Sequence, residues 1–150
     1  MSAAKLVEFD DGLKVLASSS MEARFIYDEI FRFGCYDVIC LPEQSLVIDV
    51  GANIGMFALF VKRRYPGAEI MAFEPAPVSA ACFRQNIDLH GLDDVSIAEI
   101  ALGSSPDPGA PFTYYPAIPG NSTRYPQQKG AAKAALSKRS EEHTSELQSL

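Results

Sequence analysis

A short apolar run followed by a glycine-rich turn is the feature that most restricts how this chain can fold. Residues Leu46–Val50 are apolar except for Asp49, and Gly51-Ala52-Asn53-Ile54-Gly55 follows directly. The next segment, Ile54–Tyr65, is apolar on most of its helical circumference and stops at Pro66-Gly67. A buried strand that turns sharply into a helix packed on a sheet has this pattern. We therefore expect Val47, Ile48 and Val50 to be buried in a central parallel strand.

The same alternation of strand and helix continues along the chain. A second run at Glu69–Phe73 precedes a helical pattern over Val78–Leu89, which ends at His90-Gly91, and a third run follows at Val95–Leu102. Strands separated by helices of this length form right-handed βαβ units around a parallel sheet. The sequence predicts an α/β fold with a Rossmann-like, doubly wound parallel sheet that stops after about its third core strand.

The N-terminal residues 1–20 have the pattern of a β-hairpin. Two short apolar-rich runs, Lys5–Phe9 and Leu13–Ala17, flank an Asp-Asp-Gly turn. Ser19 and Glu22 then have the spacing of a capping box ahead of a helix over Met21–Phe33. The apolar residues of that helix recur at three- and four-residue spacing and predict one buried face. They are Phe25, Ile26, Ile30 and Phe33.

The sequence changes character after the third strand. Ser104–Pro111 and Pro116–Tyr125 have the composition of loops, with a possible short strand at Phe112–Tyr115 between them. Gln127–Lys138 has helical composition but a weak pattern. Residues 21–138 are predicted to be the N-terminal portion of one domain. Residues 139–150 resemble the in-frame translation of a sequencing-library adapter, and we expect them to be a non-native tail.

Composition restricts the possible partners and compartment. The net charge of −6 argues against a nucleic-acid-binding surface, which requires a basic patch. No apolar run approaches the roughly 20 residues that cross a bilayer. The three cysteines lack CxxC spacing, so we expect buried free thiols, no bound metal and a cytoplasmic location.

The glycine turn has the chemistry of a cofactor site. Gly51 permits a tight turn with the backbone close to a ligand, and Gly55 allows close packing of the following helix. Asn53 occupies the place where a dinucleotide fingerprint has its second glycine. A carboxylate beside the turn, Asp49, disfavours a pyrophosphate but favours the ammonium of a methionyl group. The turn therefore suits S-adenosyl-L-methionine better than NAD.

A second carboxylate follows the second strand. Glu74 lies 19 residues beyond Gly55 and could accept both hydroxyls of a ribose. NAD enzymes use a carboxylate in the same way, so Glu74 alone does not distinguish the two cofactors. An NAD-dependent oxidoreductase, and a non-catalytic nucleotide-binding or interaction domain, remain the alternative functions.

Several segments together resemble the FkbM-type methyltransferases of the class I S-adenosylmethionine-dependent superfamily. The resemblance is carried by VIDVGANIGMFALFV at 47–61 and AFEPAP at 72–77, and it extends over residues 20–126. Further matching segments are FIYDEIF at 25–31, ALG at 101–103, FTYYP at 112–116 and GNST at 120–123.

The resemblance implies an O-methyltransferase that acts on a small-molecule or glycan hydroxyl, with possible fusion to a biosynthetic synthase. It implies that Asp49, Gly51, Asn53 and Gly55 line the methionyl side of the cofactor and that Glu74 holds the ribose. Ala101 and Leu102 would lie near the adenine, and the loop at 121–123 could approach the active site. The family's fourth strand, of the Leu-Lys-Ile-Asp type, is not found in this sequence. We therefore assign no catalytic residue and expect this chain alone to be inactive.

Overall fold

The structure, a computed structural model, describes residues 4–104, 111–115, 120, 122–123 and 125–127. Its helices and strands form one hydrophobic core. In chain order they are β1 (Lys5–Glu8), β2 (Lys14–Ala17), α1 (Ser20–Tyr27), the π-helix η1 (Asp28–Arg32), β3 (Leu46–Val50), α2 (Met56–Arg64), β4 (Glu69–Phe73), α3 (Pro77–His90) and β5 (Val95–Ala98).

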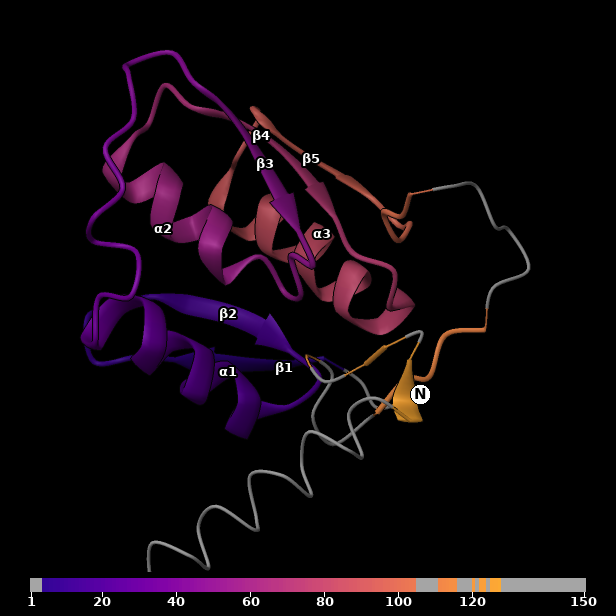
Figure 1. Cartoon of the computed structure of the whole chain (residues 1–150). Coiled ribbons are helices and arrows are strands. Elements are labelled where there is room, and N and C mark those ends of the chain that lie inside the picture. The colour runs from indigo at the N-terminus through magenta and orange to yellow at the C-terminus, as the bar shows by residue number, and fades with distance from the viewer. Residues whose placement is uncertain (1–3, 105–110, 116–119, 121, 124, 128–150) are drawn as a thin grey trace, which may run out of the picture.

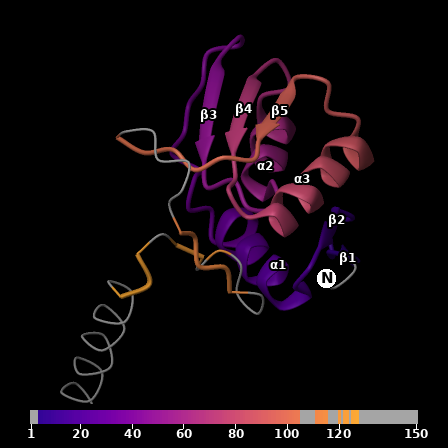
Figure 2. The same cartoon turned by 90° about the vertical axis from the view of Figure 1, so that its right-hand side faces the viewer.

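The centre of the fold is a parallel sheet with the order β3-β4-β5. Its register pairs Val47 with Ile70 and Ile70 with Val95. Helices α2 and α3 connect the strands and lie on the same side of the sheet, between it and the layer made by β1, β2 and α1 (Figures 1 and 2). The predicted βαβαβ arrangement is confirmed, and it brings the carboxyl ends of all three strands to one edge.

The opposite face of the sheet is not covered by any helix in the described part of the chain. Leu46, Ile48 and Val50 are 61%, 51% and 61% exposed, and Met71 beside them is 43% exposed. The expectations that Ile48 and Val50 are buried and that their strand is central are therefore wrong for the described residues, where β3 is an edge strand. Both crossovers place their helices on one face, so the alternate side chains of the edge strand β3 point away from the core.

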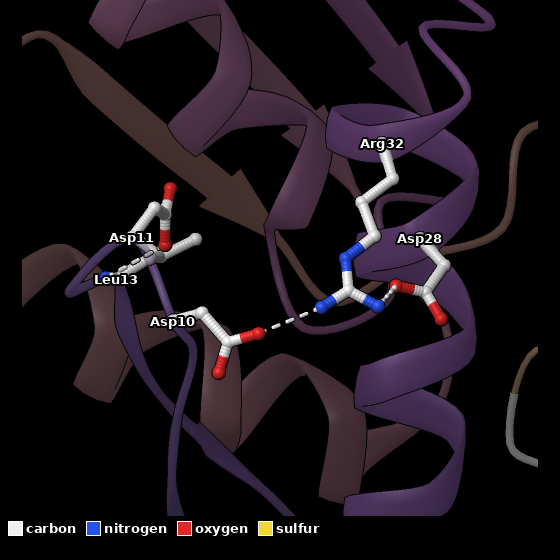
Figure 3. Close-up of polar contacts among 5 residues, drawn as sticks. All are labelled: Asp10, Asp11, Leu13, Asp28 and Arg32. Atoms are coloured by element: carbon white, nitrogen blue, oxygen red, sulfur yellow. Dashed lines mark hydrogen bonds and ion pairs between the residues drawn. The ribbon is translucent and has the colours of Figure 1, made fainter.

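The predicted hairpin is confirmed by the antiparallel pairing of β1 with β2. The carboxylate of Asp11 accepts a hydrogen bond from the backbone of Leu13 at 3.0 Å and closes the turn (Figure 3). Arg32 of η1 reaches this turn, contacting Asp10 at 2.9 Å and Asp28 of its own helix at 3.0 Å. These exposed ion pairs add little stability but align the hairpin with the helix.

A buried asparagine joins the hairpin to the rest of the core. Asn86 of α3 is fully buried, and its Oδ1 accepts a hydrogen bond from the backbone of Leu16 at 2.7 Å. Its Nδ2 donates to the carbonyl oxygens of Leu16 and Ile54, at 3.0 Å and 2.9 Å. One side chain therefore ties β2, α3 and the glycine turn together.

The first helix differs from its prediction in two ways. It is α-helical only over Ser20–Tyr27 and then widens into the π-helix η1. The buried face contains Ala23, Tyr27 and Ile30, whereas Phe25 and Phe33 are 61% and 79% exposed. Phe25 is exposed within the regular α-helical part, so the predicted apolar face is wrong there, and Phe33 lies beyond the π-helix, which changes the residues per turn. The N-cap prediction holds, since the hydroxyl of Ser19 accepts from the backbone of Glu22 at 3.3 Å.

The C-terminal predictions meet the structure only in part. The third strand ends at Ala98, before the predicted Leu102, and the proposed strand at Phe112–Tyr115 is a single bridge between Thr113 and Thr123. The predicted helix at 127–138, apart from residue 127, and the tail at 139–150 lie outside the described residues. The division into domains stays a prediction.

The thiol prediction is correct for one cysteine of three. Cys82 is buried, whereas Cys35 and Cys40 are exposed, and all three are free. None of the described helices has the length and apolarity to cross a membrane.

Candidate cofactor site

The turn after β3 is held against the neighbouring strand by backbone hydrogen bonds. The N–H groups of Gly51 and Ala52 both donate to the carbonyl of Phe73, at 2.8 Å and 3.1 Å. Gly51 has a φ of 82° and Asn53 a φ of 50°, in the left-handed region. Asparagine tolerates that region better than most residues, so the sequence supports this tight path.

The two glycines of the turn have different roles. A Cβ on Gly55 would lie 2.2 Å from the ring of Phe83, so the absence of a side chain lets α3 approach the turn. A Cβ on Gly51 would meet nothing within 4 Å. Gly55 therefore serves packing, whereas Gly51 leaves open space beside the backbone.

Glu74, which follows β4, is bonded to the turn. Its Oε2 accepts from the backbone of Asn53 at 2.8 Å, and its Oε1 accepts from the backbone of Ala76 at 2.8 Å. The residue is only 7% exposed. The carboxylate predicted to bind a ribose is thus placed at the turn and also fixes its shape.

Asp49 is a largely buried acid without a full set of partners. Burial raises the pKa of its carboxyl group from 3.8 to about 6, and the negative charge of Glu74 adds to the shift. Its Oδ2 is buried and makes no hydrogen bond within the described structure. Such a group is costly to bury and is typical of a functional site.

A third carboxylate comes from the N-terminal helix. Glu22 is 8% exposed, and its Oε1 accepts from the Nδ2 of Asn53 at 3.4 Å and from the backbone of Gly120 at 2.5 Å. Burial raises the pKa of Glu22, against the two hydrogen bonds, and the charge of Glu74 raises it further. The other end of the Asn53 amide, Oδ1, is buried and unpaired in the described structure.

Glu22, Asp49 and Asn53 line a cleft of about 430 Å³ between the glycine turn and helices α1 and η1, whereas Glu74 holds the turn without lining the cleft. The cleft lining combines carboxylates and the asparagine amide with apolar and aromatic side chains. The apolar and aromatic lining residues include Phe25, Ile26, Ile30, Tyr36 and Phe57.

Comparison with known proteins finds several similar methyltransferases. No family model matches the chain. The chain is 44% identical over 138 residues to "Methyltransferase sdnD" of Sordaria araneosa, covering 91% of this chain and 53% of that protein. It is 40% identical over 131 residues to "Methyltransferase 1" of Beauveria bassiana, covering 86% and 52%. It is 45% identical over 82 residues to "31-O-demethyl-FK506 methyltransferase FkbM" of Streptomyces tacrolimicus, covering 53% and 32%.

These similarities support the predicted resemblance to the FkbM-type methyltransferases. The chain spans about half the length of the first two of these relatives.

The structure brings together most of the residues that the sequence singles out. Asp49, Gly51 and Asn53 line the cleft, Gly55 supports the turn from behind, and Glu74 is bonded to the turn. Ala101 and Leu102 are different, because both lie beyond the end of β5 and are exposed. The premise that they close the third strand is therefore wrong.

Two residues of the site are missed by sequence reasoning. Glu22 is explained in the sequence by its capping-box spacing, yet its carboxylate turns to Asn53 and Gly120. Gly120 belongs to the GNST segment, which the resemblance includes, but the residues proposed there are the next three. Of those, Ser122 accepts from the backbone of Tyr115, and Thr123 pairs with Thr113.

Metal ligation is not indicated by the described residues, which contain no group of three or more His, Cys, Asp or Glu side chains able to hold an ion. The site offers hydrogen-bond acceptors, and its unpaired atoms, Asp49 Oδ2 and Asn53 Oδ1, both accept. Such a set fits a ligand that brings N–H or O–H donors and positive charge.

Proposed function

We propose that the cleft binds S-adenosyl-L-methionine and that the protein transfers the methyl group of this cofactor to an oxygen nucleophile. The observation that carries the proposal is the pair of buried, unpaired acceptors, Asp49 Oδ2 and Asn53 Oδ1, beside an open glycine turn. The methionyl ammonium would supply the missing donors and a compensating charge. Glu74 would accept the ribose hydroxyls while keeping its two backbone bonds, since each carboxylate oxygen has two lone pairs.

The electrostatics disfavour the alternative of an NAD-dependent oxidoreductase. Three carboxylates, those of Glu22, Asp49 and Glu74, surround the turn where a dinucleotide would place its pyrophosphate. Like charges at roughly 4 Å repel by about 4 kcal/mol at an effective dielectric constant near 20. The same charges favour a sulfonium and an ammonium. ATP is disfavoured on the same ground.

In the proposed reaction, a bond forms between the acceptor oxygen and the methyl carbon as the carbon–sulfur bond breaks. S-adenosylhomocysteine is released, and the hydroxyl proton passes to a base or to water. The described residues contribute binding and orientation, since they fix one side of the cofactor relative to the acceptor. No described residue is assigned as the base.

The acceptor and the setting of the reaction are also proposals. We infer a small-molecule or glycan hydroxyl, because FkbM is named for methylation at an oxygen of FK506. We also propose fusion to, or partnership with, a biosynthetic synthase, because the chain is 36% identical over 112 residues to "AMB antimetabolite synthetase AmbE" of Pseudomonas aeruginosa. We propose the cytoplasm as the compartment, in keeping with three free cysteines. Ala101 and Leu102 remain candidates for the adenine contact.

The proposal is tested by incubating the full-length protein that carries this chain with methyl-tritiated S-adenosylmethionine and a panel of hydroxylated acceptors. Acceptor-dependent label transfer is expected, and Gly51→Arg should abolish it by filling the open space beside the turn. Cofactor binding without transfer to any acceptor would favour the non-catalytic alternative. Transfer that is equal in Gly51→Arg would contradict the placement of the site.

A further inference from the structure

The N-terminal helix contributes a buried carboxylate to the lining of the cleft. Glu22 lies in the first turn of α1, yet only 8% of it is exposed. Its charge is compensated by N–H donors: the backbone of Gly120 at 2.5 Å and the side chain of Asn53 at 3.4 Å. No cation is paired with it among the described residues. Burying a carboxylate without a cation costs folding free energy, which suggests that Glu22 is retained for a role in the site.

Its contact with Asn53 settles which way the amide points. A carboxylate accepts but does not donate hydrogen bonds, so it must face the Nδ2 end of the amide. The Oδ1 end is thereby turned the other way, where it is buried and has no partner in the described structure. The backbone of Asn53 is fixed independently, because its N–H donates to Glu74 at 2.8 Å. Glu22 and Glu74 together leave Asn53 one orientation.

This orientation leaves two hydrogen-bond acceptors in the cleft without a donor. Asn53 Oδ1 and Asp49 Oδ2 are the two buried side-chain polar atoms without a hydrogen bond in the described structure, and both residues line the same cleft. If the amide were reversed, Asn53 would present a donor, which an ammonium group cannot accept. The orientation of one amide therefore decides whether this part of the cleft suits a cation.

We propose that Glu22 is a positioning residue that makes the cleft selective for the ammonium group of the cofactor, by orienting the Asn53 amide. The inference rests on the proposed function, which names the ligand, and adds to it the origin of selectivity within the site. Glu22 acts through Asn53 and is not itself a catalytic residue. A purely structural role, in which Glu22 only anchors Gly120 or α1, would affect every ligand of the cleft equally.

The test compares two ligands that differ in the ammonium-bearing arm. S-adenosylhomocysteine carries the arm, whereas 5′-methylthioadenosine keeps the adenosine and sulfur without it. Calorimetric titration of the full-length protein should give a dissociation constant for S-adenosylhomocysteine that rises about tenfold in Glu22→Ala. The constant for 5′-methylthioadenosine should stay the same. Glu22→Gln should restore most of the loss, since its carbonyl can still accept from the Asn53 amide.

Two further variants sharpen the comparison. Glu69→Ala removes an exposed carboxylate at the amino end of β4 and should change neither constant. The double variant Glu22→Ala/Asn53→Ala should bind S-adenosylhomocysteine no more weakly than Asn53→Ala alone, because the two residues act in series.

The outcomes separate the inference from the proposed function. Equal weakening of both ligands in Glu22→Ala, no weakening of either, or additive effects in the double variant would overturn the positioning role. Equal binding of the two ligands by the unsubstituted protein would also overturn it, while leaving an adenosine site in place. If the unsubstituted protein binds neither ligand, the proposed function itself fails.

Discussion

Replacing Asp49 with asparagine should stabilise the protein at neutral and alkaline pH while weakening its binding of the cofactor. The carboxyl group is largely buried beside Glu74, and its pKa is raised from 3.8 to about 6. At pH 8 it is therefore ionised in a place that disfavours the charge. The Asp49→Asn variant would keep the shape of the side chain and remove the charge.

The size of the expected stabilisation follows from the shift in the pKa of Asp49. Each pKa unit corresponds to about 1.4 kcal/mol, so a shift of about two units corresponds to about 3 kcal/mol. Because Asp49 is not completely buried, solvent screening reduces this value, and we expect a gain in the free energy of unfolding of about 1–3 kcal/mol at pH 8.

The dependence on pH has a definite sign. Between pH 4 and 6 the folded state holds the Asp49 proton more tightly than the unfolded state does. The contribution of this group to stability therefore falls as pH rises through that window and is constant above it. The Asp49→Asn variant lacks the effect, so its advantage should grow from near zero at about pH 4 to its full value above about pH 6.5.

The assay is denaturant unfolding of the unsubstituted protein and Asp49→Asn at a series of pH values from about 4 to 8. Differences between the two proteins at each pH remove the contribution of all other titrating groups. Asp93→Asn, at an exposed position, is the matched control for the loss of one carboxylate. An advantage of Asp49→Asn that is as large at pH 4 as at pH 8, or a loss at pH 8, would refute the reasoning.

Three other substitutions test the remaining contacts. Glu74→Ala should weaken binding of S-adenosylmethionine at least tenfold in calorimetry and lower the melting temperature, because the ribose and two backbone N–H groups lose a charged acceptor; an unchanged dissociation constant would remove it from the site. Gly55→Ala should lower the free energy of unfolding by about 2–4 kcal/mol in denaturant unfolding, since its Cβ would overlap the ring of Phe83. The control Gly91→Ala, which has open space and also a positive φ, should lower it by about 1 kcal/mol. Equal losses in the two variants would contradict the packing role of Gly55. Asn86→Ala should cost about 3 kcal/mol, because three backbone groups lose their partner, one of them fully buried; thermal unfolding within about 1 °C of the unsubstituted protein would contradict this estimate.

The local elements of this fold could be predicted because each is determined by neighbouring residues. The run Leu46–Val50, the turn at Gly51 and the stop at Gly91 have patterns that few other structures satisfy. The face of β3 that is exposed could not be predicted, because burial depends on what covers the sheet rather than on the strand's own residues. The widening of the first helix at Asp28 is likewise a packing outcome without a clear local signal.

The sequence predicts the site residues that are close together in the chain, but not those that are brought together only by folding. Asp49, Gly51 and Asn53 lie within one short segment, so the motif contains them. Glu22 is 31 positions from Asn53, and Gly120 is 98 positions from Glu22. Their meeting depends on how α1 and the loop pack against the turn. The only sequence signal for Glu22 was its capping-box spacing from Ser19, and helix capping was already a sufficient explanation for an acidic residue there.

Direct titration of the full-length protein with S-adenosylmethionine, and separately with NAD, tests the central claim that this turn is a methionyl and adenosine site. We predict saturable, one-site binding of S-adenosylmethionine that is at least about a hundredfold tighter than any binding of NAD, a difference of about 2.7 kcal/mol. Binding of NAD with equal or higher affinity, or no saturable binding of S-adenosylmethionine, would contradict the claim.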